Sequence, residues 1–241
     1  MQGVMNLIWA AAGAVIGLPA GTVLRGEVAR LSVRSGEPAE TSCRECATVL
    51  LERPALRCEH CGCWIGAAMA IELTSAAVLA LLLARIGFQP AAAAFAYLGV
   101  LAVALTQIDA AVQRLPDRLT LPAYPALIVL LGLAAVSGDT WETLVRALLG
   151  GLALGTAYVL LGLLSSGQLG GGDIKLAGLI GLVLGWLGWR TLIAGASLGF
   201  VIAAAASLAL LAGRRISRHS MISFGPYMLS GALLAVLASR W

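Results

Sequence analysis

The sequence predicts an all-α protein that crosses a membrane about eight times and carries a small zinc-binding insert. Three observations lead to this prediction. Hydrophobic residues make up 60% of the 241 residues and charged residues only 12%, which is far less charge than the surface of a soluble domain of this size needs. Apolar runs of bilayer-spanning length recur along the chain. The longest polar stretch, residues 25–64, contains all five cysteines.

Eight apolar runs define the expected membrane-spanning helices. A helix needs about 20 residues, with a range of roughly 17–25, to cross a bilayer. The sixth run is short, and only Trp189-Arg190 separates it from the seventh, so seven helices are the alternative. The first run could be a cleaved signal peptide, although no basic residue precedes it. The runs cover residues 5–24, 65–85, 91–108, 121–137, 143–164, 175–189, 191–212 and 222–239.

The basic residues predict how these helices are oriented. Twelve of the sixteen Lys and Arg residues lie in alternate loops, namely residues 25–64, 109–120, 165–175 and 213–221. Cytoplasmic loops are enriched in Lys and Arg, so eight helices place these loops in the cytoplasm and both termini outside. Seven helices would leave the three arginines of loop 213–221 outside. The small basic excess fits lipid headgroups better than nucleic acid.

The polar segment 25–64 is expected to be a cytoplasmic insert between a first helix (1–24) and a membrane core (65–241). Its cysteines form two C-x2-C pairs, Cys43 with Cys46 and Cys58 with Cys61. Two such pairs are typical of a structural zinc site with four thiolate ligands. A reducing cytoplasm disfavours disulfides, and uncommitted or redox-active thiol pairs are the alternative. Cys63 is left over as a spare thiol.

Two aspartates interrupt the apolar sequence. Asp109 follows the third run, and Asp173 closes the run Gly170-Gly171-Gly172-Asp173 before the sixth. A carboxylate at membrane depth costs roughly 2.5–3.5 kcal/mol on insertion scales, so such residues are candidates for a functional site. Two helices separate the aspartates in sequence, which predicts that both lie at the cytoplasmic face. Carboxylates held close together cannot both ionise, and such a pair can supply the base and the acid of an aspartic protease.

Other residues are expected to support this site. Gly170 and Gly172 would let the backbone adopt positive φ and approach a peptide, whereas the plain alternative is a turn in which Asp173 caps a helix. Asp117 competes with Asp109 as the first aspartate, or else caps a helix or pairs with Arg118. Lys175 could act on Asp173 or on an acidic substrate, or could anchor the helix at the membrane surface. Glu72 could line the site or pair with a basic group inside the bundle.

Three separate stretches resemble the type IV prepilin peptidase family, the bacterial G-x-G-D membrane aspartic peptidases. Asp109, followed by Leu115-Pro116-Asp117 and Leu119-Thr120-Leu121-Pro122, resembles the first aspartate block of the family. Gly170-Gly171-Gly172-Asp173-Ile174-Lys175-Leu176 resembles the second block, and Phe224-Gly225-Pro226-Tyr227 resembles the motif of the final span. The paired C-x2-C insert and Glu72 are similar to the amino-terminal part of the family.

The resemblance implies a function and a location. Family members cut the leader from prepilins and pseudopilins at the cytoplasmic face of the bacterial inner membrane, and many then methylate the new amino terminus with S-adenosylmethionine. Asp109 and Asp173 would be the catalytic pair. The chain departs from the family pattern at residues 17–25 and in the close spacing of its cysteine pairs. Two other classes remain open: a transporter that relays ions through its acids, and a non-catalytic, zinc-containing assembly factor.

Overall fold

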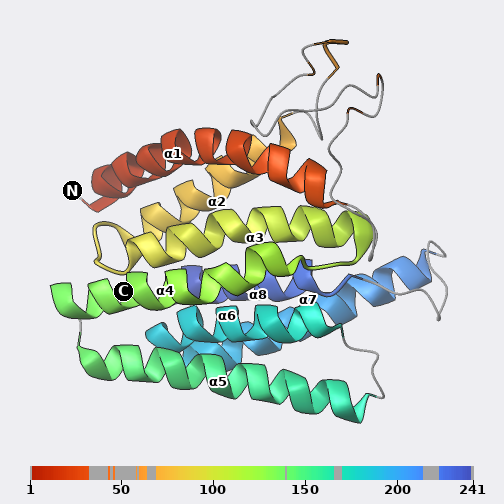
Figure 1. The fold of residues 1–241 in the computed structure, drawn as a ribbon. Coiled ribbons are helices and arrows are strands. Elements are labelled where there is room, and N and C mark those ends of the chain that lie inside the picture. The colour runs from red at the N-terminus through yellow and green to blue at the C-terminus, as the bar shows by residue number, and fades with distance from the viewer. Residues whose placement is uncertain are drawn as a thin grey trace.

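The chain folds as a single bundle of α-helices, shown in Figure 1. The computed structural model describes residues 2–32, 43, 46, 58, 60–63, 69–138, 140–165, 170–213 and 223–239. Within these ranges there are eight helices and no strand. The helices are α1 (Gln2–Leu31), α2 (Ala70–Ile86), α3 (Ala92–Val112), α4 (Asp117–Ser137), α5 (Trp141–Leu164), α6 (Gly171–Leu187), α7 (Trp189–Ala212) and α8 (Gly225–Ala238).

The helices agree with the apolar runs and favour eight over seven. α6 and α7 are separate because Gly188 has φ 126° and ψ 163°, a conformation that glycine tolerates and that ends a helix. The break therefore lies just before the expected one at Trp189-Arg190. α1 continues to Leu31, beyond the expected end at residue 24. The expected basic residues Arg214, Arg215 and Arg218 lie outside the described residues.

The chain is a multi-pass membrane protein. Five helices, α1, α3, α4, α5 and α7, are long and apolar enough to cross a membrane. α2 and α6 have 17 residues and α8 has 14, and these shorter helices pack among the longer ones. Large apolar side chains such as Val15, Leu163 and Leu164 are exposed on the outside of the bundle, which suits contact with lipid tails.

Glycines bring particular helices into close contact. A Cβ atom added at Gly17 would lie 2.5 Å from Ala76 Cα, so α1 packs directly on the backbone of α2. α5 packs on α6 in the same way, because a Cβ at Gly150 would lie 2.7 Å from the Gly181 carbonyl oxygen. Small residues that permit such approach are typical of helix contacts in membranes.

α6 is the most enclosed helix of the bundle. Every residue from Leu176 to Trp186 is buried, and α6 contacts α4, α5, α7 and α8. In Figure 1, α1 and α2 lie on one side of the bundle and α5 lies on the opposite side. α3 and α4 meet at the same end of the bundle as the start of α6 and the start of α8. This arrangement places Asp109, Asp117 and Asp173 at one end, as the loop charges predict.

Candidate active site

Asp109 lies in the last turn of α3 and is held by the start of α8. Its carboxylate is buried, and its Oδ2 atom accepts a hydrogen bond from the Gly225 backbone N–H at 3.0 Å. The Ser223 hydroxyl also donates to Oδ2. A Cβ atom at position 225 would lie 2.6 Å from Oδ2, so only glycine permits this approach. Within the described residues Oδ1 accepts no hydrogen bond, which leaves that oxygen for water, a proton or a substrate.

Asp173 lies in the first turn of α6 and is half-buried. Its backbone N–H donates to the Gly170 carbonyl at 3.0 Å, which closes the first turn of the helix. Gly170 is the N-cap residue of α6, and no side chain makes a capping hydrogen bond there. Asp173 is the third residue of the helix and not its cap, at a helix N-terminus that stabilises negative charge. The structure also places the Asp173 carboxyl within electrostatic range of Asp109.

Tyr158 of α5 connects the segments that hold the two aspartates. Its hydroxyl lies within electrostatic range of the Asp173 carboxylate. The centroid of its buried ring lies 6.3 Å from that of Phe224, the residue before Gly225. Phe200 of α7 completes an aromatic cluster, with centroids 5.7 Å from Tyr158 and 5.2 Å from Phe224. α5, α7 and α8 thus meet beside the carboxylates.

The glycines before Asp173 act through close packing. Gly170 has φ −65°, Gly172 lies within α6, and the positive-φ glycines of the described residues are Gly62, Gly87 and Gly188. The expectation of positive φ at Gly170 and Gly172 is therefore wrong. A Cβ at Gly172 would lie 2.8 Å from Leu115 Cβ, so glycine here lets α6 approach the connection between α3 and α4.

Lys175 pairs with Asp117 and not with Asp173. Its Nζ atom lies 2.6 Å from Asp117 Oδ1, and the Lys175 and Asp117 side chains are 36% and 58% exposed. Asp117 is the first residue of α4. The structure shows it paired with Lys175, whereas Arg118 was the partner considered from the sequence. An exposed pair of this kind contributes about 0–1 kcal/mol. The Lys175 carbonyl also accepts a hydrogen bond from the Tyr124 hydroxyl at 2.7 Å, which connects α4 to α6.

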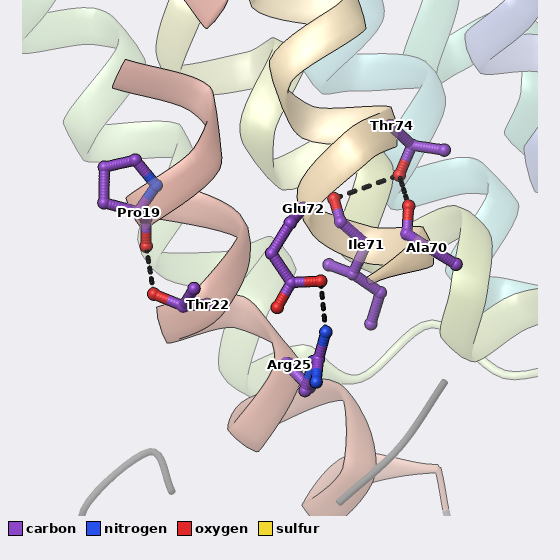
Figure 2. A network of polar contacts seen from close by, with 7 residues as sticks. All are labelled: Pro19, Thr22, Arg25, Ala70, Ile71, Glu72 and Thr74. Carbon is purple, nitrogen blue, oxygen red and sulfur yellow. Dashed lines mark hydrogen bonds and ion pairs between the residues drawn. The ribbon is translucent and has the colours of Figure 1, made fainter. Parts of the chain in front are cut away.

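Glu72 forms a buried ion pair with Arg25 of α1. Arg25 Nη2 donates to Glu72 Oε2, and the two side chains are 1% and 7% exposed. Figure 2 shows the pair between the end of α1 and the first turn of α2, beside Thr22 and Thr74. Because Glu72 neutralises the buried charge of Arg25, α1 can continue beyond this residue to Leu31. Of the two readings for Glu72, the structure shows the pairing with a basic group.

The described cysteines come together in one cluster. The Sγ atoms of Cys43, Cys58, Cys61 and Cys63 all lie within 4.8 Å of one another. Cys46 Sγ is 3.5 Å from Cys58 Sγ, and Cys43 Sγ is 3.7 Å from Cys61 Sγ. Four sulfurs around zinc at about 2.3 Å are about 3.8 Å apart, so the donor set fits a metal ion. Cys63, expected to be a spare thiol, lies inside the cluster.

Comparison with known proteins shows which family this arrangement belongs to. Residues 94–213, which include both aspartates, match the type IV leader peptidase family. Through this segment the chain belongs to the type IV leader peptidase family. The resemblance of the aspartate blocks is thereby confirmed. No solved structure matches the chain.

Curated relatives of this family extend the match towards the amino terminus. A prepilin leader peptidase/N-methyltransferase from Burkholderia pseudomallei is 35% identical over 183 residues, covering 73% of this chain and 56% of the relative. One from Dickeya chrysanthemi is 38% identical over 177 residues, covering 69% and 58%. One from Klebsiella pneumoniae is 43% identical over 89 residues, covering 36% and 37%. The chain therefore spans little more than half the length of the first two relatives.

Two residues of the candidate site could not be recognised from the sequence. Ser223 adjoins the motif at 224–227, but its contact with Asp109 depends on α3 and α8 meeting in space. Tyr158 is one aromatic residue in a long apolar helix, and its sequence carries no signal of function. Only the packing of α5 against α6 and the ring contact between Tyr158 and Phe224 place Tyr158 near the carboxylates.

Two glycine substitutions separate close approach from ordinary helix packing. Gly172→Val should strongly reduce leader cleavage, because its side chain would displace the start of α6, and Asp173 with it, from Leu115. Overpacking of this kind typically costs about 1–3 kcal/mol. Gly155→Ala is the control, since the added Cβ would lie 3.7 Å from Gly178 Cα, an ordinary contact. Turnover and thermal unfolding should be measured for both, and normal turnover by Gly172→Val would contradict the tight contact at Leu115.

Proposed function

We propose that this chain is a membrane aspartic endopeptidase that cleaves the leader peptide from prepilins or pseudopilins. The observation that carries the proposal is the pair Asp109 and Asp173, which lie at one end of the bundle within the segment that matches the family. The names of the curated relatives support prepilins as the substrate class. Residues 65–241 would form the peptidase core.

The geometry supports a division of labour between the carboxylates. Oδ2 of Asp109 is engaged by Ser223 and Gly225, so its position is fixed and Oδ1 can contact a water molecule. One carboxylate of the close pair is ionised and removes a proton from that water as it attacks the scissile carbonyl. The other carboxyl donates its proton to the carbonyl oxygen, which gives a tetrahedral diol. The first carboxyl then passes the proton that it took from water to the leaving amine, and the second recovers a proton from a diol hydroxyl as the C–N bond breaks.

The arginines support a cytoplasmic active site in the bacterial inner membrane. The basic loops and the aspartates belong to the same alternate set of connections, and that set faces the cytoplasm by the charge rule. The ion-relay alternative fits less well, because a relay needs acids along a path through the membrane. Here the carboxylates of α3 and α6 lie together at one end. The other alternative, a non-catalytic assembly factor, would not cut a prepilin, so the cleavage assay described below distinguishes it from a peptidase.

Methyl transfer is a second candidate activity, supported by the names of the relatives. S-adenosylmethionine would be the methyl donor. The cavity between α2, α3, α6 and α8 has a mainly apolar lining and does not suit this charged, polar cofactor. The geometry therefore supports the peptidase activity, and the methyltransferase activity depends on the comparison alone.

The test is cleavage of a prepilin by the purified protein in lipid vesicles. We expect a shortened product whose new amino terminus is identified by mass spectrometry. Adding S-adenosylmethionine tests for a methyl group on that terminus. An intact prepilin after prolonged incubation with folded protein would overturn the peptidase proposal.

We further propose that the cysteine cluster binds one structural zinc ion. Cys43, Cys58 and Cys61 would hold the metal, and either Cys46 or Cys63 could complete the tetrahedron because both lie next to these thiols. The ion would stabilise a segment too small to build a core of its own.

Cysteine variants test this proposal by metal analysis. We expect about one zinc per wild-type chain and a large loss of zinc in Cys58→Ser, together with a lower folded yield. The single variants Cys46→Ser and Cys63→Ser should each keep the metal, since the other thiol replaces the missing ligand. Zinc-free wild-type protein with all thiols open to titration would contradict the proposal.

A further inference from the structure

A groove in the side of the bundle opens beside the helix that carries Asp109. It has a volume of about 240 Å³ and lies between α2, α3, α6 and α8. Leu98 and Phe95 of α3, Ile180 and Val183 of α6, and Leu233 of α8 are among its apolar lining residues. On α3 the groove runs from Gln107 to Phe95, which is about 18 Å at 1.5 Å per residue. It therefore lies along the bundle axis and reaches the level of the active site.

The polar residues of this groove gather at its active-site end. They are Thr74, one turn into α2, Thr106 and Gln107 near the end of α3, and Ser230 in the first half of α8. The hydroxyls of Thr74 and Ser230 donate to carbonyls of their own helices. The half-buried side chain of Gln107 makes no hydrogen bond within the described residues. A lipid tail has no hydrogen-bond donor or acceptor for the Gln107 amide. A polar group without a hydrogen bond in an apolar environment is costly.

A peptide substrate would meet the needs of such a groove. A membrane helix that is to be cut must unwind near the scissile bond, and its freed N–H and C=O groups then need partners. Gln107 can donate to one and accept from the other, two residues from Asp109. Below this point the groove is apolar, and since an apolar cavity of about 150 Å³ binds benzene, 240 Å³ accommodates a large apolar side chain.

We propose that this groove holds the apolar membrane segment of the substrate and that Gln107 binds the unwound backbone next to the cleavage site. This inference rests on the proposed peptidase function. It assigns the groove to substrate binding, so a defect there should raise KM for membrane-anchored substrate and leave kcat unchanged.

The test compares two substrates of the same cleavage sequence. One is a prepilin with its apolar segment, and the other is a soluble peptide that ends before that segment. Ser230→Leu places a branched side chain at the mouth of the groove, and we expect an increase in KM of about tenfold for the anchored prepilin alone, the scale of a misfitted apolar contact. Ser207→Leu on α7 is the matched control, because Ser207 also bonds a carbonyl of its own helix, Ala203, and lies outside the groove.

The Gln107→Leu variant tests the polar end, and thermal unfolding verifies the fold of each variant. Gln107→Leu should weaken cleavage of both substrates, since the peptide also carries the backbone next to the cut. A binding readout that is independent of cleavage comes from a photo-reactive benzoylphenylalanine at Leu233, which should crosslink to the apolar segment of the prepilin. Crosslinks to lipid alone, or equal KM values for Ser230→Leu and wild type on the anchored prepilin, would overturn the groove proposal. Failure of the wild type to cut either substrate would instead overturn the peptidase function.

Discussion

Replacing either Asp109 or Asp173 with Asn should abolish leader cleavage while the protein remains folded. In both variants the amide keeps the size of the side chain. In Asp109→Asn its oxygen can still accept the hydrogen bond from the Gly225 N–H. It cannot take up or release the proton that the pair must exchange. Loss of a positioned acid or base costs about 10²- to 10⁴-fold, and each variant loses the function of the whole pair. Cleavage in vesicles and thermal unfolding of the same preparations measure the two effects.

Asp117→Asn is the matched control for this result. Asp117 is an acid at the same end of the bundle, but it is exposed and paired with Lys175 at 2.6 Å. We expect this variant to retain most of its activity. Normal cleavage by Asp109→Asn together with an inactive Asp117→Asn would mean that the first catalytic aspartate has been assigned to the wrong residue.

Removing one partner of the ion pair between Arg25 and Glu72 should produce the largest loss of stability. Glu72→Ala leaves the Arg25 guanidinium buried without its carboxylate, and breaking a buried pair in this way costs about 3–5 kcal/mol. Replacing both residues with Met should recover much of the loss, because apolar side chains of similar volume remove both buried charges. Thermal unfolding in detergent or vesicles measures the effect.

An exposed ion pair provides the comparison. Asp117→Ala breaks the pair with Lys175, and its cost should stay below about 1 kcal/mol because water solvates both charges. Equal losses for Glu72→Ala and Asp117→Ala would contradict the buried character of the first pair. The double Met variant should also retain the proposed leader cleavage, since the hydrogen bonds to Asp109 come from Ser223 and Gly225.

Most helices of this fold could be predicted from the sequence, because a bilayer restricts which backbone structures can cross it. Backbone polar groups must be satisfied within each membrane segment, so runs of about 20 apolar residues become helices. The helices lie close to the eight expected runs, and the separation of the sixth from the seventh follows from Gly188. The continuation of α1 past the expected end at residue 24 could not be predicted. The buried Arg25 on this extension has its partner in Glu72, which lies 47 residues away in the chain.

The candidate site was predictable in its aspartates and not in its contacts. Asp109 and Asp173 stand out because carboxylates are rare and costly in apolar segments. Gly170 and Gly172 also stand out, but the expected reason, positive φ, was wrong. The cysteine spacing predicted a cluster of Cys43, Cys46, Cys58 and Cys61, whereas the compact group of four among the described residues contains Cys63 in place of Cys46.

The sequence by itself determined which segments are helical, which end of the bundle carries the acids and which residue types could do chemistry there. These properties depend on the local apolar pattern and on the distribution of charge. The tertiary structure decided which groups meet: Ser223 and Gly225 with Asp109, Lys175 with Asp117, Arg25 with Glu72, and Tyr158 with Phe224. Such partners are set by how helices pack, because close packing depends on the shapes of distant segments.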